Sequence, residues 1–193
     1  MNATSKYALS VVLALLLQGC SHYTYDGQRY GSSEEALNAQ KQHISQVLAG
    51  VTKKSPYVGG KAFVYIPPRH VLRENGVKIS GRAQPNETAM NYIVDSLENN
   101  FSGMAETVKK GEFFDSVVVS RNLAEIQAEK NDHVIRLETS GLGQWQWYVY
   151  RADNVSNKIP LFVEGTKTGT DRLNSFNDSL SKALVSLGSN APQ

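Results

Sequence analysis

The chain contains a single cysteine, Cys20, and this limits how its fold can be held together. One cysteine cannot form a disulfide within the chain, and a metal site built on cysteine needs several thiolates. The fold must therefore be stabilised by its hydrophobic core alone. Residues 20–193 are enough to bury such a core and correspond to one domain.

Cys20 follows a segment with the layout of a secretory signal, in which the cation Lys6 precedes an apolar run. That run, residues 8–17, is shorter than the roughly 20 residues that a membrane-spanning helix needs. Leu17-Gln18-Gly19-Cys20 resembles the bacterial lipobox, which has Leu three positions before the Cys and a small residue just before it. The resemblance implies cleavage before Cys20 and acylation of both its thiol and the new amino terminus. Several acyl chains on one residue form a durable anchor, whereas one chain binds only marginally.

The lipobox resemblance also implies a location. Ser21 stands where the signal for retention in the inner membrane has Asp, so we expect the outer membrane, with the domain on its periplasmic face. The alternatives are an ordinary signal peptide with a chance cysteine and a short buried helix. The predicted organisation is a signal peptide over 1–19, a lipidated tether over 20–31, a single periplasmic domain over 32–188 and a loose tail over 189–193.

The net charge and the hydropathy of the chain limit the classes of partner that we expect it to bind. The formal net charge of +2 gives no reason to expect nucleic acid or another polyanion. No segment after the signal is long and apolar enough to span a membrane. We therefore expect membrane contact through the N-terminal lipid, together with an envelope protein partner or self-association.

Apolar stripes at helical spacing predict three main helices. Ser32 and Glu35 form a capping box for the first, which has an outer face rich in Gln, Lys and Asn and ends near Gly50. Asn86 opens the second and Gly111 ends it, with Gly103 as a possible kink. Thr170 or Asp171 opens the third, and Gly188 caps it. Asn122 and Glu125 indicate a further short helix.

Five runs rich in β-branched and aromatic residues predict strands. They are 61–66, 114–119, 133–138, 144–150 and 159–163. Between them, Asn75-Gly76 indicates a small hairpin or a flexible loop within 69–85. Early strands separated by helices, followed by consecutive hairpin strands, predict an α/β (α+β) fold with a mixed sheet of about four to five strands covered by helices.

This pattern resembles the CsgG-like envelope lipoproteins, a group that includes CsgG, PelC and LpoB. The shared features are a strand ending at Pro67, a long helix, the run Phe113–Val119, a short helix and the run His133-Val134-Ile135. The resemblance spans roughly residues 60–188 and implies a CsgG/LpoB-like sandwich with a role in envelope secretion, export or assembly. The chain lacks the group's long segment before the third strand and has a helix ahead of the domain, so no functional residues are carried over.

Catalytic chemistry is not indicated. The histidines, at positions 22, 43, 70 and 133, do not pair with another His, Cys or acid at metal-ligand spacing. No Ser lies in a Gly-x-Ser-x-Gly motif. We therefore expect a protein that is not an enzyme and has no cofactor, no metal and no catalytic residue, although Glu112, Asp115 and Glu138 could meet in space.

Two segments are candidate partner surfaces. In the aromatic run, Trp145, Trp147 and Val149 share one face, and Tyr148 and Tyr150 share the other. The simplest interpretation is a buried Trp face and a half-exposed Tyr face. The other is that Tyr148, Tyr150 and Arg151 contact a partner, since Tyr, Trp and Arg are enriched at interfaces. The second candidate is Pro68, Arg69 and His70 in the loop after the first strand, which could equally be a stiff solvated loop.

These observations predict a lipid-anchored outer-membrane lipoprotein that acts as a non-enzymatic accessory or assembly factor in envelope biogenesis or export. One alternative is a ring-forming structural component of a secretion or exopolysaccharide export machine. The other is a hydrolase of envelope polymers.

Overall fold

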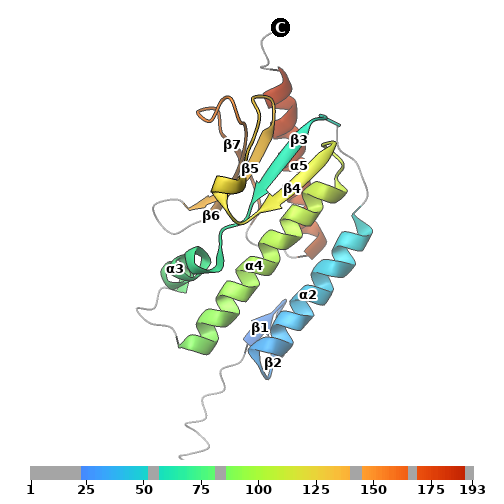
Figure 1. The fold of residues 1–193 in the computed structure, drawn as a ribbon. Helices are drawn as coiled ribbons and strands as arrows, with labels where there is room; N and C mark the ends of the chain where they lie inside the picture. The colour runs from blue at the N-terminus through green and yellow to red at the C-terminus, as the bar shows by residue number, and fades with distance from the viewer. Residues whose placement is uncertain (1–22, 52–56, 81–85, 140–144, 165–168, 190–193) are drawn as a thin grey trace, which may run out of the picture.

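The computed structural model describes residues 23–51, 57–80, 86–139, 145–164 and 169–189. Its centre is a five-stranded mixed sheet in the order β4-β3-β5-β6-β7 (Figure 1). The strands are β3 (Lys61–Tyr65), β4 (Ser116–Ser120), β5 (His133–Thr139), β6 (Trp145–Arg151) and β7 (Ile159–Leu161). β3 pairs in parallel with β4 and β5, whereas β5, β6 and β7 pair antiparallel. The predicted fold class, an α/β fold with a mixed sheet of four to five strands, is confirmed.

Three of the described helices are long, and two of them begin directly after a predicted capping residue. The three long helices are α2 (Ser33–Gly50), α4 (Glu87–Lys110) and α5 (Gly169–Ser189). Ser32 Oγ accepts the backbone N–H of Glu35 at 3.2 Å, and Asn86 Oδ1 accepts that of Ala89 at 2.8 Å. α4 continues without a break through Gly103. Within the described residues, no helix combines the length and the apolar character that crossing a bilayer requires.

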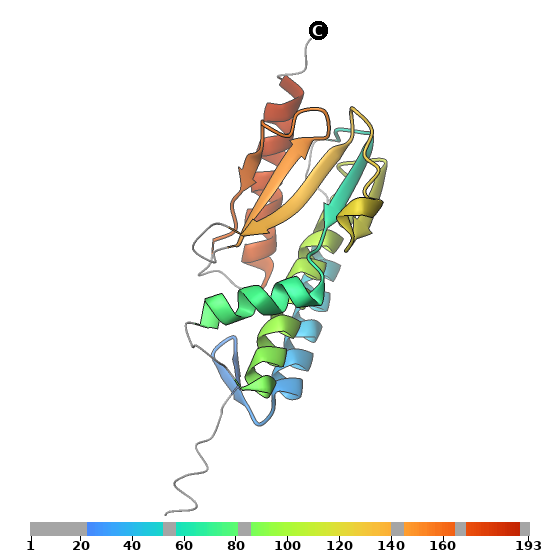
Figure 2. The same ribbon diagram turned by 60° about the vertical axis from the view of Figure 1, so that its left-hand side comes forward.

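The sheet and the helices form layers around one core. α4 and α5 pack on the same face of the sheet, and α2 packs against both helices (Figure 2). The inward strand positions alternate as expected for a pleated sheet, with Val64, Ile135, Val149 and Leu161 almost fully buried. The predicted stripe of α5 is buried along its whole length: Leu173, Phe176, Leu180, Ala183, Leu184 and Leu187.

The two crossover connections lie on opposite faces of the sheet. The chain passes from β3 to β4 through α4 on one face. It then crosses the other face through the connection that contains the 3₁₀ turn η1 (Leu123–Glu125), and enters β5 (Figures 1 and 2). Connections that move in opposite directions across a sheet lie on opposite faces when they share the same hand. One connection leads from β3 to one side of the sheet and the next leads back past β3 to β5, so the strand order reverses between β3 and β5.

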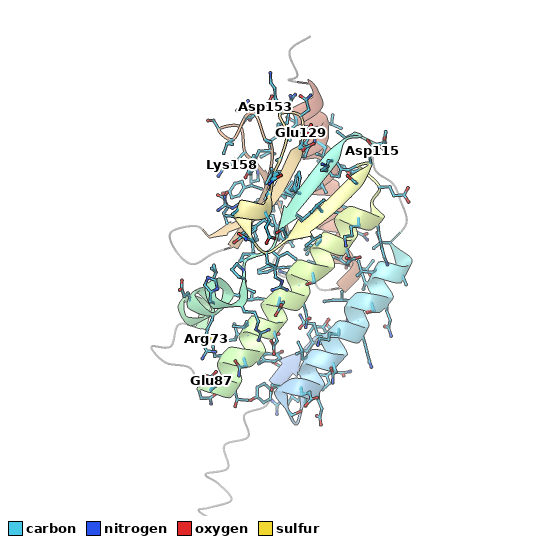
Figure 3. The ribbon with its side chains drawn as sticks, viewed as in Figure 1. Arg73, Glu87, Asp115, Glu129, Asp153 and Lys158 are labelled. Atoms are coloured by element: carbon cyan, nitrogen blue, oxygen red, sulfur yellow. The ribbon has the colours of Figure 1, made fainter. Side chains whose placement is uncertain are left out.

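The prediction of a hairpin or loop around Asn75-Gly76 is wrong, because a helix, α3 (Arg69–Ser80), occupies this segment. Pro68 starts it, since its carbonyl accepts the N–H groups of Val71 and Leu72 at 3.0 and 3.1 Å. Leu72 is fully buried against the body of the protein. Arg73 forms an ion pair with Glu87 at the start of α4 (Figure 3). These long-range contacts outweigh the turn preference of Asn-Gly.

The prediction of a tether over 20–31 also needs correction. Residues 23–30 form a two-stranded hairpin of β1 (Tyr23–Tyr25) and β2 (Gln28–Tyr30), with a turn at Asp26-Gly27. Both turn residues have positive φ, 49° and 75°, a conformation that favours glycine. The hairpin packs on α2 and contacts α4 through Tyr92, so it belongs to the domain.

Candidate functional site

The reversal of strand order creates a crevice at the carboxyl ends of β3 and β5. In open α/β sheets, ligands bind where the strand order reverses, just outside the carboxyl ends of the strands. The crevice here has a volume of about 460 Å³. It is lined by Tyr65, Pro67, Val71, Arg136, Leu137, Glu138 and Lys158, and we call it the β3–β5 crevice. The sequence alone does not predict this crevice, because the order of strands in a sheet cannot be read from one chain.

The charges in the crevice come from Arg136, Glu138 and Lys158. Glu138 Oε1 accepts a hydrogen bond from Lys158 Nζ at 2.8 Å, and Arg136 Nε lies 3.7 Å from the same oxygen. The three side chains are a quarter to a third exposed, at 33% for Arg136, 24% for Glu138 and 31% for Lys158. One carboxylate thus faces two cations and leaves one positive charge in excess. Arg136 Nε is buried and has no hydrogen-bond partner among the described residues.

Tyrosine rings support both cations. Tyr65, Arg136 and Tyr148 occupy directly neighbouring positions on β3, β5 and β6, so they form a row on one face of the sheet. The guanidinium of Arg136 lies 5.6 Å from the ring centre of Tyr65. The ammonium of Lys158 lies 5.6 Å from the ring centre of Tyr150 and 6.0 Å from that of Tyr148. Such contacts contribute about 0.5–1 kcal/mol at exposed sites and hold the cations in place.

The side chains of the predicted aromatic surface differ in how exposed they are. Trp147 is 5% exposed and lies in the core, as the simplest interpretation has it. Tyr148 is half-buried at the crevice side of the sheet, but Tyr150 is only 6% exposed. Tyr150 therefore does not present an open surface, because it is covered within the sheet beside the buried Val134. The side chain of Trp145 lies outside the described residues.

Arg151 is also engaged within the fold. Its guanidinium pairs with Asp153 at 3.0 Å and donates to Asn131 Oδ1 at 3.0 Å. Strand alternation places it on the face of Trp147 and not on the face of Tyr148. Arg151 is therefore separated from the crevice.

The Pro68-Arg69-His70 segment starts α3 at the edge of the crevice. Arg69 pairs with Asp95 at 2.6 Å and with Glu98, both on α4. Arg121, after β4, pairs with the same Glu98. These contacts raise the pKa of Arg69 above its ordinary value, with the hydrogen bond to Asp95 as the largest cause. Arg69 thus fixes α3 to α4, while His70 is exposed and Pro68 is half-buried.

The arrangement of the crevice is suited to binding. Arg136 and Lys158 retain donor groups that an anionic or hydroxyl-rich partner could accept, and the tyrosine rings offer flat contact surfaces. The lining residues include no Ser, Cys or His. Among the described residues, no group of three or more His, Cys, Asp or Glu side chains is placed to hold a metal ion. The expectations of no metal, no cofactor and no enzyme activity stay predictions, and Cys20 lies outside the described residues.

The comparisons with known proteins are uniformly negative. No family model, no curated protein and no solved structure matches the chain. The resemblance to the CsgG-like lipoproteins therefore stays a prediction.

His133, at the start of β5, is a buried titratable group close to Arg151. It is 8% exposed and packs on Phe114, with 5.4 Å between the ring centres. Its Nδ1 is buried and has no hydrogen-bond partner among the described residues. Burial, followed by the charge of Arg151, lowers the pKa of His133 below its ordinary value of 6.5. The folded protein thus favours the neutral imidazole.

This shift predicts how stability depends on pH. Below pH 6.5 the unfolded chain binds a proton at His133 that the folded chain resists, so the free energy of unfolding should fall as the pH is lowered from 7.5 to 5.5. Urea unfolding at the two pH values measures the fall. It should be smaller in His133→Gln and unchanged in His70→Gln, the exposed control. An equal fall in His133→Gln and wild type would contradict the buried neutral state.

Proposed function

We propose that the protein is an outer-membrane lipoprotein that acts by binding, as a non-enzymatic accessory or assembly factor in envelope biogenesis or export. The domain would face the periplasm and would recognise its partner through the β3–β5 crevice. The observation that carries the proposal is the position of the N-terminal hairpin, which joins the predicted lipid anchor directly to the folded domain.

The chain between the anchor and the domain is short. β1 begins at Tyr23, so only Ser21 and His22 separate the fold from Cys20. Three consecutive Cα–Cα steps of about 3.8 Å span at most about 11 Å. A lipid on Cys20 would therefore hold the hairpin within about that distance of the membrane surface, which a long flexible tether would not do.

The hairpin is in turn fixed to two helices. Tyr92, on α4, donates its hydroxyl proton to the carbonyl of Thr24 at 3.1 Å, and its ring lies 5.4 Å from that of Tyr23. Tyr25 contacts His43 on α2, with ring centres 5.9 Å apart. The end of the molecule that carries the hairpin would thus face the membrane, with the sheet directed away from it (Figure 1). Lys158 of the crevice lies on the flank of the sheet, where a periplasmic partner could approach (Figure 3).

The charge of the crevice favours a partner that offers a carboxylate. Glu138 neutralises one of the two cations, and the unused donors of Arg136 and Lys158 match an acidic side chain. Because all three groups are partly exposed, we expect this contact to add mainly specificity.

A ring-forming structural role is the second candidate. β4 and β7 are the edges of the sheet, and each has an exposed apolar side chain on or beside it: Val118 is 41% and Phe162 is 68% exposed. Uncovered sheet edges can pair with a second chain.

The anchor is tested by Cys20→Ser. Cells fed an alkyne-labelled fatty acid should label the wild-type protein, and Cys20→Ser should carry no label because it lacks the acceptor thiol. Ser21→Ala, which keeps the acceptor and Leu17, should be labelled like wild type. Equal labelling of Cys20→Ser and wild type would disprove lipidation at this residue.

The crevice is tested by crosslinking in intact envelopes followed by purification of the protein. Lys158→Gln should reduce recovery of the crosslinked partner at least fivefold, because it removes a cation from the crevice. Lys182→Gln, an exposed lysine on α5, serves as the matched control and should leave recovery unchanged. Full recovery with Lys158→Gln would exclude the crevice as the contact surface, and crosslinks only between copies of the chain would favour the ring-forming role.

A further inference from the structure

A second cavity lies between the N-terminal hairpin and three helices, away from the β3–β5 crevice. It has a volume of about 250 Å³ and is formed by the β1–β2 turn region, α2, α4 and α5. We call it the hairpin cavity. Its lining combines apolar side chains with two polar groups, Arg172 and Gln40, that each have a buried atom without a hydrogen-bond partner among the described residues.

The charged group in the hairpin cavity is Arg172, near the start of α5. Among the described residues, its buried Nε atom has no hydrogen-bond acceptor and no carboxylate forms an ion pair with its guanidinium. Burial lowers the pKa of Arg172, and the neighbouring Tyr25 only partly opposes this effect. Burial also raises the pKa of Tyr25, which favours the neutral phenol. A partly buried cation without a counter-ion is destabilising, so an anion placed here would stabilise the fold.

Gln40, on α2, is the second polar group in the hairpin cavity. It is only 5% exposed, and its buried Oε1 has no hydrogen-bond partner in the part of the chain that the structure describes. A buried amide without partners is unfavourable by about 1–3 kcal/mol. Because the two ends of the amide exchange by a rotation of 180°, Gln40 can also present its N–H₂ to an anion. Gln40 lies four residues before Ile44 and seven before Val47, so helical spacing places this polar side chain on the buried face of α2.

Apolar side chains form much of the remaining wall, beside the polar Thr24 and Asn100. Ile44 and Val47 from α2, Met104 from α4 and Leu173 from α5 line the hairpin cavity. Gly103 keeps α4 close to α2, since a Cβ there would lie 3.2 Å from Ile44 Cγ2.

One acidic residue lies at the rim. Asp26, in the hairpin turn, is half-exposed, and its Oδ2 is 4.0 Å from His43 Nδ1. Its negative charge disfavours a second anion beside the turn, so an anionic group in the hairpin cavity should lie on the Arg172 side.

We propose that the hairpin cavity binds a small amphiphile with one carboxylate and a short aliphatic chain. The carboxylate accepts hydrogen bonds from Arg172 and from the amide of Gln40, and the chain lies against Ile44, Val47 and Met104. This site is separate from the β3–β5 crevice, and it does not depend on lipidation of Cys20 or on a role in the envelope.

Equilibrium dialysis of radiolabelled octanoate against the full chain in phosphatidylcholine vesicles, with empty vesicles subtracted, tests the proposal. Wild type should bind octanoate saturably at one site per chain. Arg172→Gln should weaken binding at least tenfold. Arg29→Gln removes an equal charge from the exposed face of the hairpin and should bind within twofold of wild type.

Competition against wild type supplies a readout that does not rely on a variant folding correctly. Affinity should rise at least tenfold from butyrate to octanoate and then fall for tetradecanoate, because the volume of the hairpin cavity limits the chain. Octanol, which lacks the carboxylate, should compete at least tenfold more weakly than octanoate. No saturable octanoate binding, equal binding by a folded Arg172→Gln, or equal competition by octanol would each overturn the proposal.

Discussion

The packing of Trp147 joins the two halves of the fold. Its ring, on β6, lies 6.0 Å from that of Phe101 on α4 and 5.6 Å from that of Phe176 on α5, both in edge-to-face orientation. Each such aromatic pair contributes roughly 0.5–1.5 kcal/mol beyond the burial of its area. One side chain thus holds both helices on the same face of the sheet. The connection from β4 to β5 crosses the other face of the sheet. The crevice lies where the strand order reverses.

The two candidate binding sites follow from this arrangement. The β3–β5 crevice lies at the strand ends and combines partly exposed charges with tyrosine rings. The hairpin cavity lies among the helices, where Arg172 and Gln40 meet apolar walls. The first suits an acidic protein surface, and the second suits a small carboxylate with an aliphatic chain. The hairpin links these features to the predicted anchor, because β1 lines the hairpin cavity and begins three residues after Cys20.

Local signals in the sequence predict much of the fold. The caps at Ser32 and Asn86 and the apolar stripes are short-range features, and the helices form where they indicate. The core position of Trp147 follows from alternation along β6. α3 could not be predicted this way, since its stability comes from Leu72 and from the ion pairs of Arg69 and Arg73 with α4, which are distant in sequence.

The candidate sites were less predictable. Alternation correctly separates the two faces of β6, but it cannot show that Tyr150 is covered while Tyr148 borders the crevice. The partners of Arg136 and Glu138 come from neighbouring strands, and Gln40 lies in a cavity formed by the hairpin and three helices. A single polar residue among the apolar positions of a helix does not show which elements will surround it. Which residues line the candidate binding sites is thus decided by tertiary contacts.

The orientation of the domain on the membrane tests the central claim most directly. Because Cys20 is the only cysteine and would be lipidated, Gln28→Cys in the hairpin or Val155→Cys in the β6–β7 connection provides a single thiol for a fluorophore. The connection lies at the end of the molecule remote from the hairpin, where Asp153 is labelled in Figure 3. In vesicles that carry a quencher on the lipid headgroups, the account predicts strong quenching at position 28 and little at position 155. Quenching at position 28 should disappear when Cys20→Ser is added. Equal quenching at both positions, or quenching at position 28 that survives Cys20→Ser, would contradict a lipid anchor coupled to the hairpin.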